Sequence, residues 1–126
     1  MKSLLLDTNA LVFYSDNSPR FGPKTKRLLA SDVNLLYSPL SLFELNWKAK
    51  HNPRFKHSIT SERLKELGFR EAKVDSAVCE GMRGLKSDDP FDHLLVNHAS
   101  VIGVQFLTSD TKILGSGLDF VVDLTD

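Results

Sequence analysis

The sequence predicts an α/β fold with one parallel sheet covered by helices on both faces. Short apolar runs that suit strands alternate with longer amphipathic stretches that suit helices. Two of the runs are apolar throughout instead of alternating, which is typical of strands buried on both faces. The chain has 126 residues, enough for one hydrophobic core, and contains no repeat or inter-domain linker. We therefore expect a single domain over residues 1–126.

In the first part of the chain, apolar runs bounded by turn residues predict strands, and helix formers with apolar residues at helical spacing predict helices. Ser41 is expected to cap one helix, which offers Leu45 and Trp47 for burial before Pro53 ends it. The predicted elements are strands at residues 3–6 and 33–37 and helices at residues 23–30, 41–50 and 61–67.

The second part of the chain continues the alternation. Asp75 is expected to cap a helix that Gly84 follows, and Gly103 ends a strongly helical stretch that begins at Pro90. The predicted elements are strands at residues 72–74, 104–107 and 120–124 and helices at residues 76–83, 90–101 and 111–114.

The single cysteine, Cys79, excludes an internal disulfide and a multi-cysteine zinc site. Because it lies beside Val78 on an apolar stripe, we expect a buried structural thiol. No apolar stretch approaches the roughly 20 residues of a membrane span, and the apolar run before Asp7 is too short for a signal peptide. We expect a cytoplasmic protein without a membrane partner.

Charge is distributed unevenly along a chain that is neutral overall. Residues 1–74 contain 13 Lys and Arg against 7 Asp and Glu, whereas residues 75–126 contain 3 against 9. The basic part could contact a polyanion while acids from the second part help to bind cations. Alternatively, the two parts complement each other within one domain, and the sequence leaves both interpretations open.

Two carboxylates, Asp7 and Asp110, each follow a predicted strand. Open parallel sheets bind ligands at the carboxyl ends of their strands, so the two carboxylates converge if their strands are neighbours. A divalent cation makes such a cluster tolerable, and oxygen-only ligands favour Mg²⁺ or Mn²⁺. An ion of this kind supports phosphodiester hydrolysis, so the expected substrate is a nucleic acid or a phosphate ester.

Further acids lie in predicted helices. Glu44 stands among apolar residues, and an ordinary solvated glutamate is the alternative interpretation. In the segment DDPFDHLL, Asp89 has the place of an N-cap before Pro90. Asp92 lies in the first helical turn, where the helix dipole alone favours a carboxylate. Capping explains Asp89 well and Asp92 less completely, so Asp89 is assigned a supporting role.

Four segments stand out in order along the chain: LLLDTNALV, SLFELNWK, DPFDHLLVNHA and FLTSD. They resemble the motif blocks of PIN-domain ribonucleases, in particular the small VapC-type toxins of toxin–antitoxin pairs. The resemblance implies a three-layer α/β/α fold with a central parallel sheet and a Mg²⁺- or Mn²⁺-dependent endoribonuclease. It maps the catalytic acids onto Asp7, Glu44, Asp92 and Asp110, and the metal ligands onto Asp7, Asp92 and Asp110.

The resemblance also implies supporting residues. A polar residue next to the first acid, Asn9 or Thr8, and the hydroxyl of Thr108 would support the site. The chain departs from the family pattern at His93 and Ser109, where many relatives carry Arg. Contacts with RNA phosphates at those positions would therefore be weaker or supplied elsewhere.

The stretch KAKHNPRFKH, which follows Glu44, could supply such contacts. Its cations suit phosphates, and Phe55 offers one ring for stacking, although a solvated helix end and loop is the alternative. The expected RNA-binding residues are Lys48, Lys50, Arg54 and Lys56.

Protein partners are also expected, since the resemblance implies a homodimer and, for a toxin, an antitoxin. Several apolar side chains exceed what one small helical layer needs to bury, so part of this surface is expected to meet a second copy or an antitoxin segment. These side chains are Leu42, Phe43, Trp47, Phe55 and Leu64.

Two other functions compete with the nuclease. A phosphatase or phosphotransfer domain also carries an Asp after its first strand, but position 9 is Asn where a haloacid-dehalogenase-type motif requires a second Asp. A PIN-like binding scaffold without activity would have lost one of the four acids, and all four are present.

Overall fold

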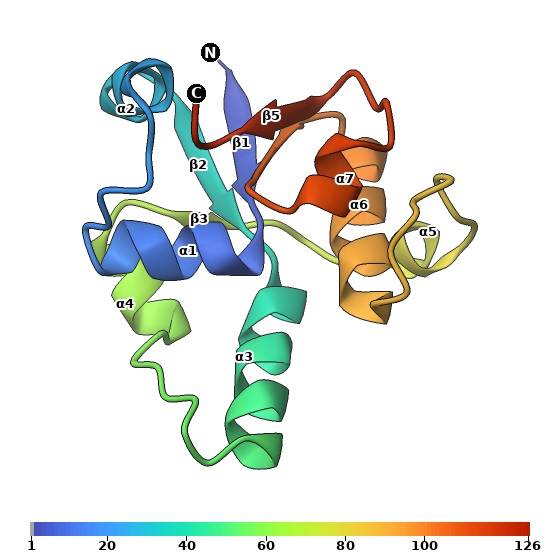
Figure 1. Cartoon of the computed structure of the whole chain (residues 1–126), viewed down its shortest axis with the longest axis horizontal. Coiled ribbons are helices and arrows are strands. Elements are labelled where there is room, and N and C mark those ends of the chain that lie inside the picture. Colours follow the sequence, from blue (N-terminus) through green and yellow to red (C-terminus); the bar gives the residue numbers. More distant parts are fainter. Residues whose placement is uncertain (1) are drawn as a thin grey trace.

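The computed structural model describes residues 2–126 and shows a parallel β-sheet between two layers of helices (Figure 1). The strands follow the order β3-β2-β1-β4-β5, and each neighbouring pair is parallel. The order changes direction between β1 and β4, which makes that position the topological switch point where open α/β sheets bind ligands. The strands are β1 Ser3–Leu6, β2 Asn34–Tyr37, β3 Arg70–Glu71, β4 Gln105–Thr108 and β5 Val121–Asp123.

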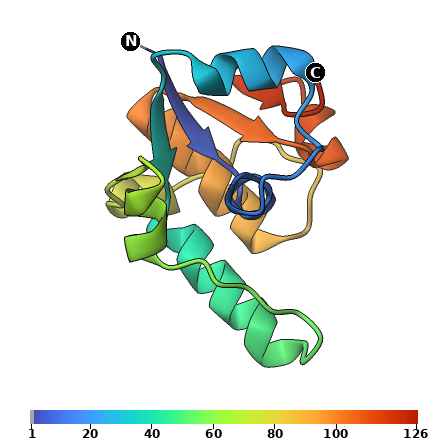
Figure 2. The same ribbon diagram turned by 90° about the vertical axis from the view of Figure 1, so that its left-hand side faces the viewer.

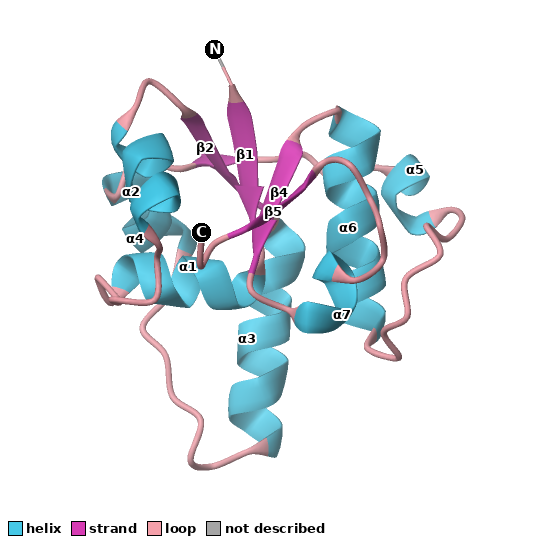
Figure 3. Cartoon of the chain, turned by 45° about the horizontal axis from the view of Figure 1, so that its top comes forward, coloured by secondary structure: helices cyan, strands magenta, loops and turns pink. Residues whose placement is uncertain are grey.

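Alternate side chains of β1 pack into two separate hydrophobic cores, one on each face of the sheet. Leu4 and Leu6 pack with side chains of α1 to α4, whereas Leu5 packs with α6 and α7. Figure 3 shows α1, α2 and α4 on one side of the strands and α6 and α7 on the other. The helices are α1 Thr8–Ser15, α2 Pro23–Ala30, α3 Pro39–His51, α4 Ser61–Glu66, α5 Ser76–Cys79, α6 Pro90–Ile102 and α7 Thr111–Leu114.

The predicted three-layer α/β/α class with a central parallel sheet is confirmed. The strand at residues 3–6 and the helices at residues 23–30 and 111–114 have the predicted bounds. Gly103 ends α6 with φ 72°, a left-handed conformation that glycine adopts without strain. Within residues 2–126, no helix is long and apolar enough to cross a membrane.

Helix α1 was not predicted, because its residues give no amphipathic signal. The segment TNALVFYS has apolar side chains on several faces and includes the β-branched Val12, which has low helix propensity. Asp7 starts the helix by accepting a hydrogen bond from the Thr8 amide at 2.8 Å. Ala10 and Leu11 are then fully buried against the sheet, so tertiary packing decides the conformation.

The expected cap of α3 is wrong by three residues. Ser41 and Glu44 have the spacing of a capping box, but Ser38 is the N-cap, and its hydroxyl accepts from the Leu40 amide at 3.1 Å. Pro39 occupies the first helical position, where its missing N–H has no cost. Ser41 therefore lies one turn inside the helix, fully buried.

Four other expectations also need correction. The strand expected at residues 72–74 is instead β3, Arg70–Glu71. The helix capped by Asp75 ends at Cys79, because the glycines that follow it, Gly81 at φ 78° and Gly84 at φ 74°, are left-handed. Cys79 is exposed rather than buried, since the inward position of this single turn belongs to Val78. Trp47 is 49% exposed rather than buried.

Candidate active site

The carboxyl ends of β1 and β4 meet at the centre of the sheet, where Leu6 pairs with Leu107. Asp7 directly follows β1, and Asp110 follows β4 by two residues. The sequence argument required these two strands to be neighbours, and the sheet order confirms that they are. Asp7 and Asp110 thus lie at one edge of the sheet, beside the switch point.

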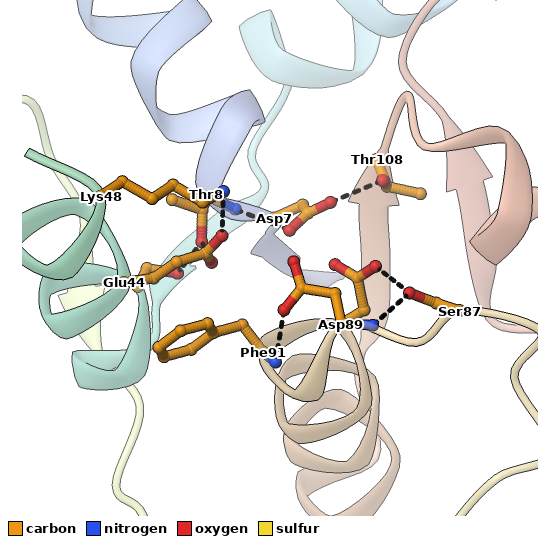
Figure 4. A network of polar contacts seen from close by, with 10 residues as sticks. Asp7, Thr8, Glu44, Lys48, Ser87, Asp89, Phe91 and Thr108 are labelled. Atoms are coloured by element: carbon orange, nitrogen blue, oxygen red, sulfur yellow. Dashed lines mark hydrogen bonds and ion pairs between the residues drawn. The ribbon is translucent and has the colours of Figure 1, made fainter. Parts of the chain in front are cut away.

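Thr108 joins the two strand ends through its hydroxyl. Its Oγ1 donates to Asp7 Oδ2 at 2.7 Å and accepts from the Asp110 amide at 3.0 Å. Figure 4 shows the first of these bonds. Since Thr108 is fully buried, it sets the position of Asp7 relative to the loop that carries Asp110.

Asp7 is only 6% exposed, an unusual place for a charged group. Burial raises the pKa of its carboxyl from 3.8 to about 7, although the hydrogen bonds from Thr108 and the Thr8 amide act in the opposite direction. The carboxylates of Asp92 and Glu44 raise this pKa further. The metal-free protein therefore compensates a negative charge on Asp7 only in part.

Asp110 caps α7 and is partly exposed. Its Oδ1 accepts hydrogen bonds from the Lys112 amide at 2.9 Å and the Ile113 amide at 3.1 Å. Both bonds fall on the same oxygen, so the cap orients the carboxylate and directs Oδ2 elsewhere. Capping and metal binding are compatible at this residue.

At the start of α6, Asp89 and Asp92 have different roles. Asp89 is the N-cap, as the sequence predicted, and accepts from the Phe91 amide at 2.9 Å. Asp92 is buried, and its Oδ2 accepts from the Ser87 hydroxyl at 2.5 Å. Burial raises the pKa of Asp92 against the effect of this bond, and the carboxylates of Asp89, Asp110 and Glu44 add to the rise.

Glu44 is 3% exposed and holds two partners. Its Oε1 lies 2.5 Å from the hydroxyl of Thr8, which also lies 3.0 Å from Ser41 Oγ. Its Oε2 forms an ion pair with Lys48 Nζ at 2.5 Å. Burial alone lowers the pKa of Lys48, but the hydrogen bond to Glu44 and the nearby carboxylates raise it overall. The alternative interpretation of Glu44 as a solvated surface residue is therefore excluded.

We call the five carboxylates at this edge the acid cluster; they belong to Asp7, Glu44, Asp89, Asp92 and Asp110. Within residues 2–126, no three His, Cys, Asp or Glu side chains are arranged to hold a metal ion as they stand. Binding would therefore require side-chain adjustment. The donor chemistry nevertheless fits Mg²⁺ or Mn²⁺, because the ligands are all oxygens and their mutual repulsion favours a cation.

The remaining predicted residues lie at different places. Asn9 is exposed on α1, and it is Thr8 that contacts Glu44. Lys48 contacts the acid cluster through its ion pair with Glu44. Lys50, Arg54 and Lys56 are exposed at the far end of α3 and in the following loop.

Two supporting residues escaped the sequence argument. Ser87 holds Asp92, and Ser41 contacts Thr8. The segment S-x-D before Pro90 could have indicated a turn that brings Ser87 back to α6, since the Ser87 hydroxyl also accepts from the Asp89 amide at 3.1 Å. Ser41 gave no comparable signal, because its contact joins residues 33 positions apart.

Comparison with known proteins agrees with this architecture. The model of the PIN domain family matches residues 4–114. The chain is similar to a structure described as VapBC2 from Rickettsia felis bound to a DNA fragment from their promoter, with 15% identity, a TM-score of 0.65, and 96% of this chain and 98% of the other covered. It is also similar to DNA-bound VapBC from Salmonella typhimurium, with 18% identity, a TM-score of 0.57, and coverage of 98% and 99%.

No curated protein matches the chain. The two solved structures share too little sequence with it to show more than the fold. The family match, in contrast, runs from β1 to the end of α7, without β5, and includes every member of the acid cluster. The chain therefore belongs to the PIN-domain family.

Proposed function

We propose that this PIN-domain protein is a metal-dependent endoribonuclease that hydrolyses RNA phosphodiester bonds. One observation carries the proposal: buried carboxylates from three separate segments, Asp7, Glu44 and Asp92, influence one another at the switch point of the sheet. Buried like charges are destabilising, so their retention indicates a function. Asp110 adds a fourth carboxylate from the neighbouring strand end.

Asp7, Asp92 and Asp110 would hold Mg²⁺ or Mn²⁺. When bound, such an ion supplies a water of lowered pKa and stabilises the charge that develops on the phosphoryl group. Thr108 and the Thr8 amide orient the two oxygens of Asp7, and Ser87 orients one oxygen of Asp92.

Glu44 supports the site through its neighbours rather than through the proposed ion. Its two oxygens face Thr8 and Lys48. The Lys48 ammonium has three donors, and its side chain is 40% exposed, so it can contact a substrate phosphate while it stays close to Glu44. Lys48 would therefore lie beside the reacting phosphate. Lys50, Arg54 and Lys56 would contact the RNA substrate further from the acid cluster.

We propose further that the protein acts in the cytoplasm as the toxin of a toxin–antitoxin pair. Both similar structures are described as VapBC, which supports an antitoxin as partner. We also propose a homodimer, but fewer of the side chains predicted for its interface are exposed than the sequence suggested. Leu64 is fully buried, and Leu42 and Phe55 pack against the core, so only Phe43 and Trp47 of the five predicted side chains remain largely exposed.

The test is cleavage of a single-stranded or loop-containing RNA by the purified protein with Mn²⁺, with Mg²⁺ and with EDTA. Asp7→Asn should abolish cleavage, because it removes a charged ligand while keeping the shape of the side chain. Asp16→Asn is the matched control, since Asp16 is an exposed carboxylate at the other end of α1. Cleavage that persists in EDTA, or equal activity in both variants, contradicts the proposal.

A folded protein that binds RNA without cleaving it under any of these conditions would instead support the binding scaffold. A phosphatase would be recognised by release of inorganic phosphate from a monoester, with no internal cleavage of the RNA. These outcomes separate the three functions that the sequence left open.

A further inference from the structure

A cleft of about 510 Å³ lies between α5 and α6. Its walls come from Cys79 of α5, from the loop that follows, and from one side of α6, and within residues 2–126 none of the five acids of the acid cluster lines it. Figure 1 places α5 on the side of α6 away from α3, and Figure 2 shows α3 projecting away from the sheet. The cleft is therefore separate from the exposed face of α3, and its volume suits a small ligand.

Asn97 has a buried carbonyl oxygen beside this cleft. The side chain is 3% exposed, and its amide nitrogen donates to the carbonyls of Val78 at 3.3 Å and Gly81 at 3.0 Å. These two bonds identify the nitrogen of the amide, so the other atom is the acceptor Oδ1. Within residues 2–126, Oδ1 has no hydrogen-bond partner. Because a buried acceptor without a donor costs free energy, a ligand that donates to it is favoured.

His93 offers a second acceptor one helical turn earlier. Its Nε2 lies 2.7 Å from the Ser87 carbonyl, and a carbonyl can only accept, so Nε2 carries the proton. In the neutral ring Nδ1 is then an acceptor, and it too has no partner among the described residues. A spacing of four residues places His93 and Asn97 on one face of α6, and both line the cleft. The α6 wall thus carries two acceptors without donors.

The rest of the lining adds a negative charge and apolar surface. Asp88 is an exposed carboxylate, and within residues 2–126 no lysine or arginine forms an ion pair with it. The apolar side chains are Met82, Pro90 and Leu94. The two acceptors of α6 are closed off from solvent, so a ligand reaches them only after a side chain moves. Met82, which is 69% exposed and flexible, can move aside in this way.

These groups match the chemistry of a guanidinium on a short aliphatic chain. A guanidinium has N–H donors and no acceptor, so it can pair with both acceptors of α6 and with the Asp88 carboxylate. It is also more weakly hydrated than an ammonium, which favours its entry into a partly apolar cleft. The methylene groups of its chain can pack against Pro90 and Leu94. An anion, in contrast, would face acceptors and a carboxylate.

We propose that the cleft between α5 and α6 binds an alkylguanidinium through Asn97 Oδ1, His93 Nδ1 and the Asp88 carboxylate. The site is independent of the proposed nuclease, because none of these three residues belongs to the acid cluster. A free guanidinium compound and the arginine side chain of a peptide share this chemistry, so the test includes both sources.

Isothermal titration calorimetry of the full-length protein tests the site at about pH 8, where imidazole is ordinarily neutral. The buffer contains EDTA and about 0.15 M salt, which screens unspecific attraction. The probes are agmatine and putrescine, which share the same aliphatic chain and differ in one end group, guanidinium or ammonium. Agmatine should bind in one saturable step with a Kd below about 1 mM, and putrescine about 10-fold more weakly. Equal affinities would overturn the proposal, since any cation would then serve.

Two variants locate the site. Asp88→Asn changes an exposed residue, so it should keep the fold and weaken agmatine binding about 3- to 30-fold. His93→Phe keeps a ring but lacks Nδ1, and it should weaken binding about 10-fold. Circular dichroism verifies that each variant is folded. Unchanged affinity in both variants would overturn the proposal.

Asp7→Asn is the matched control, because the carboxylates of the acid cluster could also attract a cation. Its affinity for agmatine should equal that of the wild type. Loss of agmatine binding in Asp7→Asn but not in Asp88→Asn would overturn the proposal, since the cation would then lie at the acid cluster.

A blocked tripeptide with arginine at its centre identifies the source of the guanidinium. Tighter binding of agmatine supports a free compound as the ligand, whereas tighter binding of the tripeptide supports an arginine side chain in the same cleft. Binding of neither probe overturns the proposal. RNA cleavage enters none of these measurements, so the guanidinium site and the nuclease fail separately.

Discussion

At the scale of single residues, neutral hydroxyl groups hold most of the acid cluster in place. Thr108 donates to Asp7, Ser87 to Asp92, and Thr8 contacts Glu44. A hydroxyl fixes the direction of a carboxylate without cancelling its charge, whereas a lysine or arginine would neutralise it. Among the described residues 2–126, a cation contacts this cluster only at Glu44, through Lys48. Within residues 2–126, the acids of the strand ends and of α6 thus have no cationic side chain as partner, and a divalent ion would supply the positive charge that favours their ionised form.

Asp7 should make the metal-free protein less stable as pH rises. Its folded pKa of about 7 exceeds the ordinary value of 3.8. The folded state therefore favours the protonated form, and this stabilisation is complete below pH 3.8 and is lost as pH rises through about 7. Relative to a neutral side chain, the loss amounts to about 4 kcal/mol at pH 8.

The measurement is urea unfolding of wild type and Asp7→Asn in EDTA between pH 4 and pH 8. Both proteins should have similar unfolding free energies near pH 4, and Asp7→Asn should become the more stable one as pH rises. The difference between them isolates Asp7 from other groups that titrate. A difference that stays constant across this range would show that the Asp7 carboxyl titrates normally.

At the scale of secondary structure, the start of each helix near the site serves both folding and function. Ser38 caps α3 and contacts the buried His98 of α6 at 2.9 Å, while His98 also contacts the Lys73 carbonyl at 2.8 Å. Burial lowers the pKa of His98, which favours the neutral ring in this contact. The capped end of α3 is thereby fixed to α6. This contact holds the two helices that carry Glu44 and Asp92 in a defined relative position.

The start of α6 allows the two roles of its acids to be separated. Asp89→Ala removes the N-cap and should reduce the unfolding free energy by about 1 kcal/mol, with much of the cleavage activity retained. Asp92→Asn should keep the fold, since Ser87 can still donate to the amide oxygen, and should lose cleavage. Thermal unfolding and RNA cleavage are measured on both variants. Loss of cleavage in Asp89→Ala without any loss of stability would assign Asp89 to the metal site.

At the scale of the whole molecule, the end of the chain closes the structure beside α2. The amide of Gly22 donates to the Leu124 carbonyl at 2.9 Å, and the Thr25 amide donates to Asp126 at 3.0 Å. A Cβ on Gly22 would lie 2.3 Å from backbone atoms of Thr125 and Asp126. Glycine is needed here for close backbone approach, with ordinary negative φ.

Gly22→Ala should therefore destabilise the protein by about 1–3 kcal/mol, because either the segment after β5 or the start of α2 must move. Lys24→Ala is the matched control, since Lys24 is an exposed residue of the same helix turn. Chemical denaturation measures both. The Leu124 amide also donates to the Thr108 carbonyl at 2.9 Å, and Thr108 holds Asp7, so a shift of the segment after β5 should also reduce cleavage per folded molecule in Gly22→Ala. Equal stability of the two variants would contradict the close approach.

The sequence by itself determined the fold class, most strands and helices, and the strand-end position of Asp7 and Asp110. These follow from local information, namely apolar runs, caps and helix breakers, which act over a few residues. Helix α1 and the cap of α3 were not predictable in this way, because packing against the sheet overrides weak or misleading local signals.

Only the tertiary structure decided how the acids are held and which side chains face solvent. Thr108 and Asp7 are 101 positions apart, and Thr8 and Glu44 are 36 apart, so no local pattern could pair them. The exposure of Phe43 and Trp47 likewise depends on α3 projecting beyond the sheet. Composition and periodicity identify what a side chain can do, whereas long-range packing decides what it meets.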